Sequence, residues 1–262
     1  MDLSNLFSLE SRIALVTGGS RNLGKIIASA YIAQGATVYI SSRKAADYDA
    51  TAEELGPNCY SLPEDLSTVR GAQKLVVALS KKQQKLDILV NNAGAYWSAP
   101  FASFSEMGWD KVMDINLKSP FFLTQALHPM LKIGASGDHP AKVINITSVD
   151  GQRLSAWDTY SYQTSKAALI YLTKRLAAEL IRDNIVVTSI APGAFPSDMN
   201  QTARDDPAGV ATYIPMRRIG TDEDLAGAAI FLASRAGDYV VGDTLTVDGG
   251  VVNASLAELA NN

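Results

Sequence analysis

The chain has 262 residues, of which 47% are apolar and 19% are charged. A composition of this kind can bury a large core, which excludes a disordered or low-complexity protein. Lysine and arginine number 23 against 27 acidic residues, so the net charge of −4 has the wrong sign for a protein that binds the phosphate backbone of nucleic acids.

Short runs rich in β-branched residues alternate with longer segments along the chain. Seven of these runs are expected to be strands: Ile13–Thr17, Ala36–Ser41, Asn58–Leu62, Asp87–Val90, Lys142–Thr147, Ile185–Ile190 and Thr244–Val247. Most of them are nearly all apolar, without polar alternation, which is typical of strands buried on both faces of a parallel sheet.

The intervening segments carry apolar residues at spacings of three and four, as amphipathic helices do. The expected helices are Leu23–Gln34, Asp49–Leu55, Ser67–Lys82, Glu106–Leu131, Asp158–Arg182 and Asp222–Ala233. Strands and helices that alternate in this order predict an α/β fold: a Rossmann-type, doubly wound sheet of about seven parallel strands with helices on both faces. No linker divides the sequence, so we expect residues 1–262 to form a single domain.

The stretch from Gly193 to Gly220 has no clear periodicity and contains three prolines. It follows the sixth predicted strand, and loops at the carboxyl ends of parallel strands border the ligand crevice of such sheets. We therefore expect residues 193–220 to form a lid over the substrate.

The first predicted strand ends in a glycine-rich turn, Thr17-Gly-Gly-Ser-Arg-Asn-Leu-Gly24, at the start of a helix. Backbone N–H groups at such a place, together with the helix dipole, favour a bound pyrophosphate. The spacing does not match Gly-x-Gly-x-x-Gly, and by itself the motif is also explained as a plain turn.

Further motifs occupy fixed places along the same predicted sheet. They are Asn91-Asn-Ala-Gly94, Asn116, Ser148, Tyr162-Gln-Thr-Ser-Lys166, Pro192-Gly193 and Val247-Asp-Gly-Gly250. From Arg12 to Gly250, this ordered set resembles the short-chain dehydrogenase/reductase family, most closely its 3-oxoacyl (β-ketoacyl) reductase branch with the rhamnolipid-type reductases.

The resemblance assigns four catalytic residues. It implies that Tyr162 is the acid/base, that Ser148 hydrogen-bonds the substrate oxygen, and that Lys166 holds the nicotinamide ribose. It also implies that Asn116 anchors a proton-relaying water. Ser148 is also explained as a turn residue after a strand, and Asn116 as a buried amide that satisfies the backbone.

Lys166 follows Tyr162 by one helical turn, so both side chains project from one face. A cation about 4 Å from a phenol, at an effective dielectric of about 20, is worth roughly 4 kcal/mol, or about three pKa units at most. We therefore expect Lys166 to bring the pKa of Tyr162 toward neutrality.

The second predicted strand ends without the acidic residue that binds the ribose 2′-hydroxyl of NAD. Ser42 and Arg43 stand there, and no acid precedes Asp47; Arg21 in the glycine-rich turn adds a second cation. Both arginines suit a 2′-phosphate, so the expected cofactor is NADPH/NADP+ and not NADH. Arg43 is also explained as a solvated residue after a strand.

The resemblance gives the expected cofactor-binding set. Its members are Gly18, Ser20, Arg21, Asn22, Leu23, Gly24, Ser42, Arg43, Asp65, Leu66, Asn92, Ala93, Gly94, Tyr162, Lys166, Pro192, Gly193 and Ser197. Asn22 departs from the family, whose pattern Thr-Gly-x-x-x-Gly-x-Gly has glycine at that position. Asparagine tolerates positive φ, so we expect the turn to survive and its amide to be available to a phosphate.

Apolar and aromatic side chains dominate the loops that should face the crevice. The expected substrate contacts are Tyr96, Trp97, Arg153, Trp157, Phe195 and Met199, with Arg153 available to an anionic tail. This set favours NADPH-dependent reduction of an apolar ketone or a 3-oxoacyl substrate, although any of its members can instead be packing residues. The alternative is an NAD(P)-dependent alcohol or polyol dehydrogenase working in the oxidative direction.

The remaining expectations concern partners and location. One cysteine, Cys59, and two histidines predict neither an internal disulfide nor a metal site, and no export signal or membrane span is visible, so we expect a cytoplasmic protein. The resemblance implies a homotetramer that contacts a small-molecule ketone or acyl substrate, with no nucleic acid and no membrane as partners.

Overall fold

The computed structural model describes residues 3–41 and 45–255, with the side chains of residues 45–48 left out. Seven parallel strands form one sheet in the order β3-β2-β1-β4-β5-β6-β7. Their bounds are β1 Ile13–Thr17, β2 Thr37–Ser41, β3 Cys59–Ser61, β4 Ile88–Asn91, β5 Ala141–Ile146, β6 Ile185–Pro192 and β7 Thr244–Val247. The predicted fold class and strand number are confirmed.

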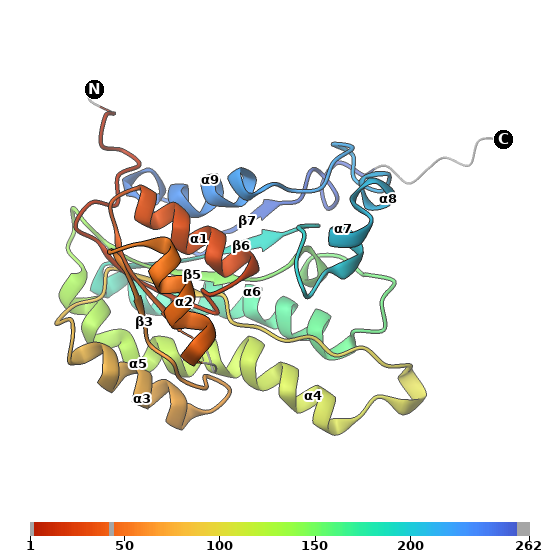
Figure 1. The fold of residues 1–262 in the computed structure, drawn as a ribbon, viewed down its shortest axis with the longest axis horizontal. Coiled ribbons are helices and arrows are strands. Elements are labelled where there is room, and N and C mark those ends of the chain that lie inside the picture. Colours follow the sequence, from red (N-terminus) through yellow and green to blue (C-terminus); the bar gives the residue numbers. More distant parts are fainter. Residues whose placement is uncertain (1–2, 42–44, 256–262) are drawn as a thin grey trace.

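Helices cover both faces of the sheet (Figure 1). The helices are α1 Asn22–Ala33, α2 Ala45–Leu55, α3 Val69–Ser80, α4 Glu106–Met113, α5 Ser119–Gly134, α6 Tyr160–Leu180, α7 Gln201–Asp205, α8 Pro207–Ala211 and α9 Asp222–Ala233. One core packs α1, α2 and α9 against the sheet, and the other packs α3, α5 and α6 against its opposite face.

The strand side chains explain both cores. Val16 and Val90 point into the core beneath α1 and α9, whereas Leu15 and Leu89 point into the other. Because successive side chains alternate between faces, a strand with helices on both sides is expected to be apolar at most positions.

Three segments differ from the sequence predictions. The single helix expected from Glu106 to Leu131 is two helices, α4 and α5, joined by a π-helical turn at Asp114–Lys118. Strand β6 continues to Pro192, where it still pairs with Val247 of β7. The aperiodic stretch from 193 to 220 contains α7 and α8, which lie beyond the tips of β6 and β7 (Figure 1).

The order of the strands reverses between β1 and β4, so the loops after these two strands diverge and leave a crevice at their carboxyl ends. The Thr17 hydroxyl accepts hydrogen bonds from the N–H groups of Asn92 and Ala93, both at 2.9 Å. These bonds fix the glycine-rich turn against the Asn91–Gly94 motif. Within the described residues, no helix is both long and apolar enough to cross a membrane.

Candidate active site

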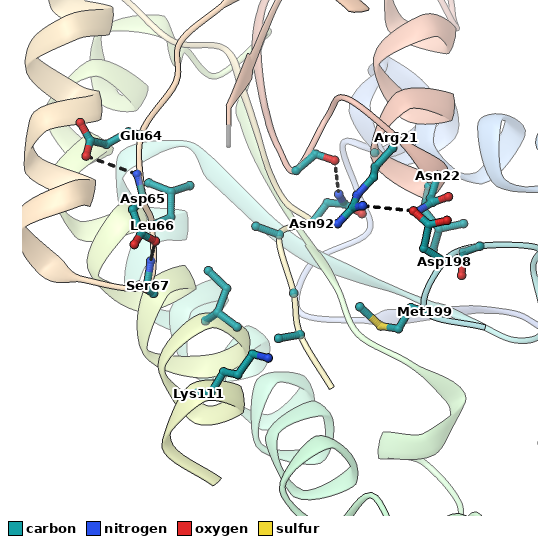
Figure 2. Close-up of a pocket in the computed structure, with 18 residues that line it drawn as sticks. Arg21, Asn22, Glu64, Asp65, Leu66, Ser67, Asn92, Lys111, Asp198 and Met199 are labelled. Carbon is teal, nitrogen blue, oxygen red and sulfur yellow. Dashed lines mark hydrogen bonds and ion pairs between the residues drawn. The ribbon is translucent and has the colours of Figure 1, made fainter. Parts of the chain in front are cut away.

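A cavity of about 250 Å³ lies at this crevice (Figure 2). Its lining includes the predicted residues Gly18, Arg21, Asn22, Leu23, Gly24, Asp65, Leu66, Asn92, Ala93, Gly94, Ser197 and Met199. Glu64, Ser67, Ala95, Lys111, Ile115 and Asp198 also line it and were not predicted. The cavity thus joins the loops after β1, β3, β4 and β6.

The glycine-rich turn fits a phosphate because its glycines have no side chains to cover the backbone N–H groups. An added Cβ at Gly24 would overlap the carbonyl oxygen of Gly18 and lie 2.5 Å from Nδ2 of Asn92, so only glycine allows this approach. The N-cap residue of α1, Arg21, makes no side-chain capping bond, and the first turn of the helix contains no acidic residue. The first N–H groups of α1 are therefore available to an anion at the positive end of the helix.

Asn22 has a positive φ of 50°, in the left-handed region where the family has glycine. Asparagine accepts this conformation at small cost, so the turn survives as expected. Its side-chain amide donates to Asp198 Oδ2 at 3.3 Å instead of pointing into open solvent (Figure 2). The departure from the family pattern therefore adds a side-chain contact between the turn and the segment after β6, which is predicted to be a lid.

Replacing Asn22 by glycine is expected to keep the affinity for NADPH or to improve it, because glycine adopts the same φ freely and removes the bond to Asp198. Fluorescence titration with NADPH checks this. A loss of more than about tenfold, equal to about 1.4 kcal/mol, would show that the Asn22 amide itself binds the cofactor.

The predicted catalytic side chains meet beside the cavity. Ser148 caps the 3₁₀ turn Val149–Gly151 after β5, and its hydroxyl is hydrogen-bonded to that of Tyr162 in α6. Lys166 lies one turn further along α6, and its Nζ donates to the carbonyl oxygen of Ile146 at 2.7 Å. Lys166 therefore lies close to the cavity: a Cβ added at Gly94, which lines the cavity, would lie 4.0 Å from Nζ of Lys166.

The pKa values of this cluster follow burial. Burial raises the pKa of Tyr162 to about 12, and the charge of Asp150 adds to the rise while the bond with Ser148 opposes it. Burial also lowers the pKa of Lys166 to about 8. The expectation that Lys166 brings the pKa of Tyr162 toward neutrality is wrong for this structure, because burial of the phenol outweighs the attraction of a cation whose Nζ lies 5.7 Å from the ring centroid and bonds to a carbonyl.

Asn116 lies in the π-helical turn between α4 and α5 and is 1% exposed. Its Oδ1 accepts from the N–H of Ala95 at 2.8 Å, and its Nδ2 donates to the Ala95 carbonyl at 2.9 Å and to the Ser165 hydroxyl at 3.0 Å. The Asn116 side chain thus links the cavity wall to α6. These contacts fit the alternative interpretation of Asn116, a buried amide that satisfies backbone hydrogen bonds.

Some residues predicted to bind cofactor lie elsewhere. Ser20, Tyr162, Lys166, Pro192 and Gly193 do not line the cavity. Gly193 instead lets the end of β6 approach the backbone just after β7, since an added Cβ would lie 2.8 Å from Cα of Asp248. The side chains of Ser42 and Arg43 lie outside the described residues.

Among the predicted substrate residues, Phe195 needs correction, whereas Trp97 and Arg153 remain predictions although both make other contacts in the structure. Phe195 is 3% exposed and packs in the core beneath α1 and α9; it borders a second cavity, of about 630 Å³, that contains neither Ser148 nor Tyr162. Trp97 packs against Gly108 with Nζ of Lys111 5.2 Å from its ring centroid.

The Arg153 guanidinium donates to the carbonyl oxygen of Val251 at 2.9 Å. Tyr96 and Trp157 are exposed, and Met199 lines the cavity. An apolar residue in a loop packs into the core wherever the tertiary structure covers it, which explains why Phe195 does not face the predicted site.

Comparison with known proteins identifies the family of this fold. A family model described as "Enoyl-(Acyl carrier protein) reductase" matches residues 18–252. The chain belongs to the short-chain dehydrogenase/reductase family. It is 45% identical over 249 residues, 93% of this chain and 97% of the relative, to a rhamnolipids biosynthesis 3-oxoacyl-[acyl-carrier-protein] reductase from Pseudomonas aeruginosa.

Two further similarities widen the comparison. A galactitol 2-dehydrogenase from Agrobacterium fabrum is 34% identical over 254 residues, covering 92% of this chain and 98% of the relative. The solved RhlG/NADP active-site complex from Pseudomonas aeruginosa has a TM-score of 0.91 and 44% identity, covering 94% of this chain and 98% of that one. These relatives include both a ketone reductase and a polyol dehydrogenase by name.

Proposed function

We propose that the chain is an NADPH-dependent ketoreductase that reduces an apolar ketone or a 3-oxoacyl-type substrate to the alcohol. The observation that carries the proposal is the hydrogen-bonded pair of Ser148 and Tyr162, with Lys166 one helical turn away. This cluster lies beside a cavity whose glycine-rich turn leaves its backbone accessible to a phosphate. The similarity to a 3-oxoacyl reductase supports the direction of the reaction.

The chain supplies acid catalysis. When bound, the nicotinamide ring would supply a hydride to the carbonyl carbon. Tyr162 donates its phenolic proton to the carbonyl oxygen, and the Ser148 hydroxyl hydrogen-bonds the same oxygen as it gains charge. Protonated Lys166 stabilises the phenolate that remains, and Asn116 holds the cavity wall against α6.

NADPH is the proposed cofactor because the segment that follows β2 has basic residues where NAD-binding enzymes have an acidic residue. Arg21 lines the cavity, and Arg43 follows β2 in the sequence. A 2′-phosphate suits the planar fork of a guanidinium, whereas a carboxylate would repel it. The complex of a similar protein with NADP supports this choice.

A second candidate function is oxidation of an alcohol or polyol by NAD(P)+. One active site catalyses both directions, and the similarity to a galactitol 2-dehydrogenase favours this alternative. The apolar Met199 in the cavity wall and the exposed Tyr96 and Trp157 favour an apolar substrate over a sugar alcohol.

A screen for NADPH oxidation separates these functions. The substrates are 3-oxoacyl thioesters, aryl ketones, sugars and enoyl thioesters, with NADH run in parallel and galactitol plus NADP+ for the reverse direction. We expect turnover of 3-oxoacyl thioesters or aryl ketones with a higher kcat/KM for NADPH than for NADH. Turnover confined to polyols, or to enoyl thioesters, would refute the proposal.

The pKa of Lys166, lowered to about 8 by burial, predicts the pH profile of the reduction. Tyr162 remains a protonated donor to higher pH, while Lys166 loses its charge above about pH 8 and no longer stabilises the phenolate. We therefore expect kcat/KM to be constant below pH 7 and to fall through pH 8. In Lys166→Arg, whose side chain stays charged, the fall should disappear; a wild-type profile flat to pH 9 would contradict this role.

The proposed assembly is a homotetramer. Trp109 on α4, Phe121 on α5 and Tyr171 on α6 are large apolar side chains left exposed, as expected for helices that pack against another subunit. A sedimentation mass of one subunit would contradict the tetramer.

The proposed location is the cytoplasm. Buried Cys59 is a free thiol, which suits this reducing compartment.

A further inference from the structure

Asp198 joins the glycine-rich turn to the lid across the cavity (Figure 2). Its Oδ2 accepts a hydrogen bond from Nη1 of Arg21 at 3.2 Å and one from Nδ2 of Asn22 at 3.3 Å. Its Oδ1 accepts from Nη1 of Arg204 in α7 at 3.4 Å, although Arg204 is held more closely by Asp205, at 2.8 Å. The carboxylate therefore occupies two donors of the turn at once.

These donors belong to the part of the cavity proposed to hold the cofactor's phosphates. A guanidinium binds a carboxylate and a phosphate with the same fork of N–H groups, so the two anions exclude each other from one edge of Arg21. Asn22 strengthens the hold of Asp198, since the glycine of the family pattern has no side chain to donate.

We propose that Asp198 is a residue that sets cofactor preference: it competes with the 2′-phosphate of NADPH for Arg21 and so reduces the advantage of NADPH over NADH. This inference rests on the proposed function, because it takes the cavity as the cofactor site. The bond from Arg21 breaks when the phosphate takes the guanidinium, and the start of the lid is then held to the turn by Asn22 alone.

The size of the effect follows from exposure. The side chains of Arg21 and Asp198 are 73% and 51% exposed, and ion pairs exposed to this degree are weak. Removing such a pair changes an equilibrium about two- to fivefold. We therefore expect Asp198→Asn to tighten NADP+ about two- to fivefold and to leave the Kd for NAD+, which lacks the 2′-phosphate, within about 1.5-fold.

The test is a set of titrations with NADP+ and NAD+ at constant ionic strength. Asp198→Asn is measured alone and with Arg21→Ala, and Asp198→Glu, which keeps the carboxylate, serves as the conservative control. The proposal predicts that Asp198→Asn tightens NADP+ only when Arg21 is present and that Asp198→Glu binds NADP+ as the wild type does. Melting temperatures of all variants report on folding.

The other outcomes overturn the inference in distinguishable ways. Equal tightening of NADP+ and NAD+, or tightening that persists with Arg21→Ala, means that Asp198 repels nucleotides in general. No change in Asp198→Asn means that the ion pair does not compete with the cofactor. If wild-type protein binds neither nucleotide, the proposed function fails and the inference fails with it.

Discussion

Replacing Tyr162 by phenylalanine is expected to lower kcat for ketone reduction at least about 100-fold, because the substitution removes the phenolic proton donor of α6 that is hydrogen-bonded to Ser148. Phenylalanine keeps the ring, so the packing around it and the contact with Lys166 survive. The Kd for NADPH should therefore stay within about twofold of the wild-type value, while kcat falls. Steady-state kinetics and a fluorescence titration measure the two quantities.

Tyr160 supplies the matched control. It lies two residues before Tyr162 in the same helix, but its hydroxyl donates to Asp158 at 2.9 Å and its ring packs edge-on against Phe104, with centroids 5.4 Å apart. Tyr160→Phe loses a tyrosine hydroxyl outside the cluster and should retain nearly full turnover. Near-full turnover in Tyr162→Phe would instead reject the acid–base role.

Gly24→Ala is expected to raise the Kd for NADPH at least about tenfold. The new methyl group would overlap the carbonyl of Gly18 and press on Nδ2 of Asn92, so the turn must move away from α1. Overpacking of this kind costs about 1–3 kcal/mol, and a loss of about 1.4 kcal/mol in binding is tenfold. Titration with NADPH and thermal unfolding measure the loss of affinity and of stability separately.

Gly227→Ala is the control, because Gly227 is also a helical glycine. It lies in α9, where an added Cβ meets no atom within 4 Å. Alanine favours a helix over glycine by up to about 1 kcal/mol, so this variant should be as stable as the wild type or more so, with unchanged affinity. Wild-type binding of NADPH by Gly24→Ala would mean that the turn does not hold the cofactor.

The sheet was predictable because most of its strands are nearly all apolar on both faces. Runs such as Ile13–Thr17 can be buried only between two layers of helices, and the structure places them there. The π-helical turn at Asp114–Lys118 was not predictable, because the apolar spacing of α4 continues into α5 without a break. Local signals for α7 and α8 did exist: Asn200 and Asp206 cap them, and Pro207 begins the second.

The candidate site was predictable where a residue belongs to a sequence motif. Asp198 lies outside any such motif, and its carboxylate reaches Arg21 only because the lid folds back over β1. Lys111 likewise enters the cavity wall from α4, distant in sequence from the glycine-rich turn. Such contacts depend on tertiary structure, so spacing along the chain does not reveal them.

The most direct test of the central claim is the transfer of deuterium from labelled NADPH to a ketone. Each of the two stereoisomers of NADPH with deuterium at nicotinamide C4 is prepared and mixed with a 3-oxoacyl thioester and the protein. The mass of the product is then measured by mass spectrometry. We predict a 3-hydroxyacyl thioester that carries one deuterium at C3 with one stereoisomer and none with the other. Consumption of NADPH without deuterium in the product from either stereoisomer, or no product at all, would contradict the account.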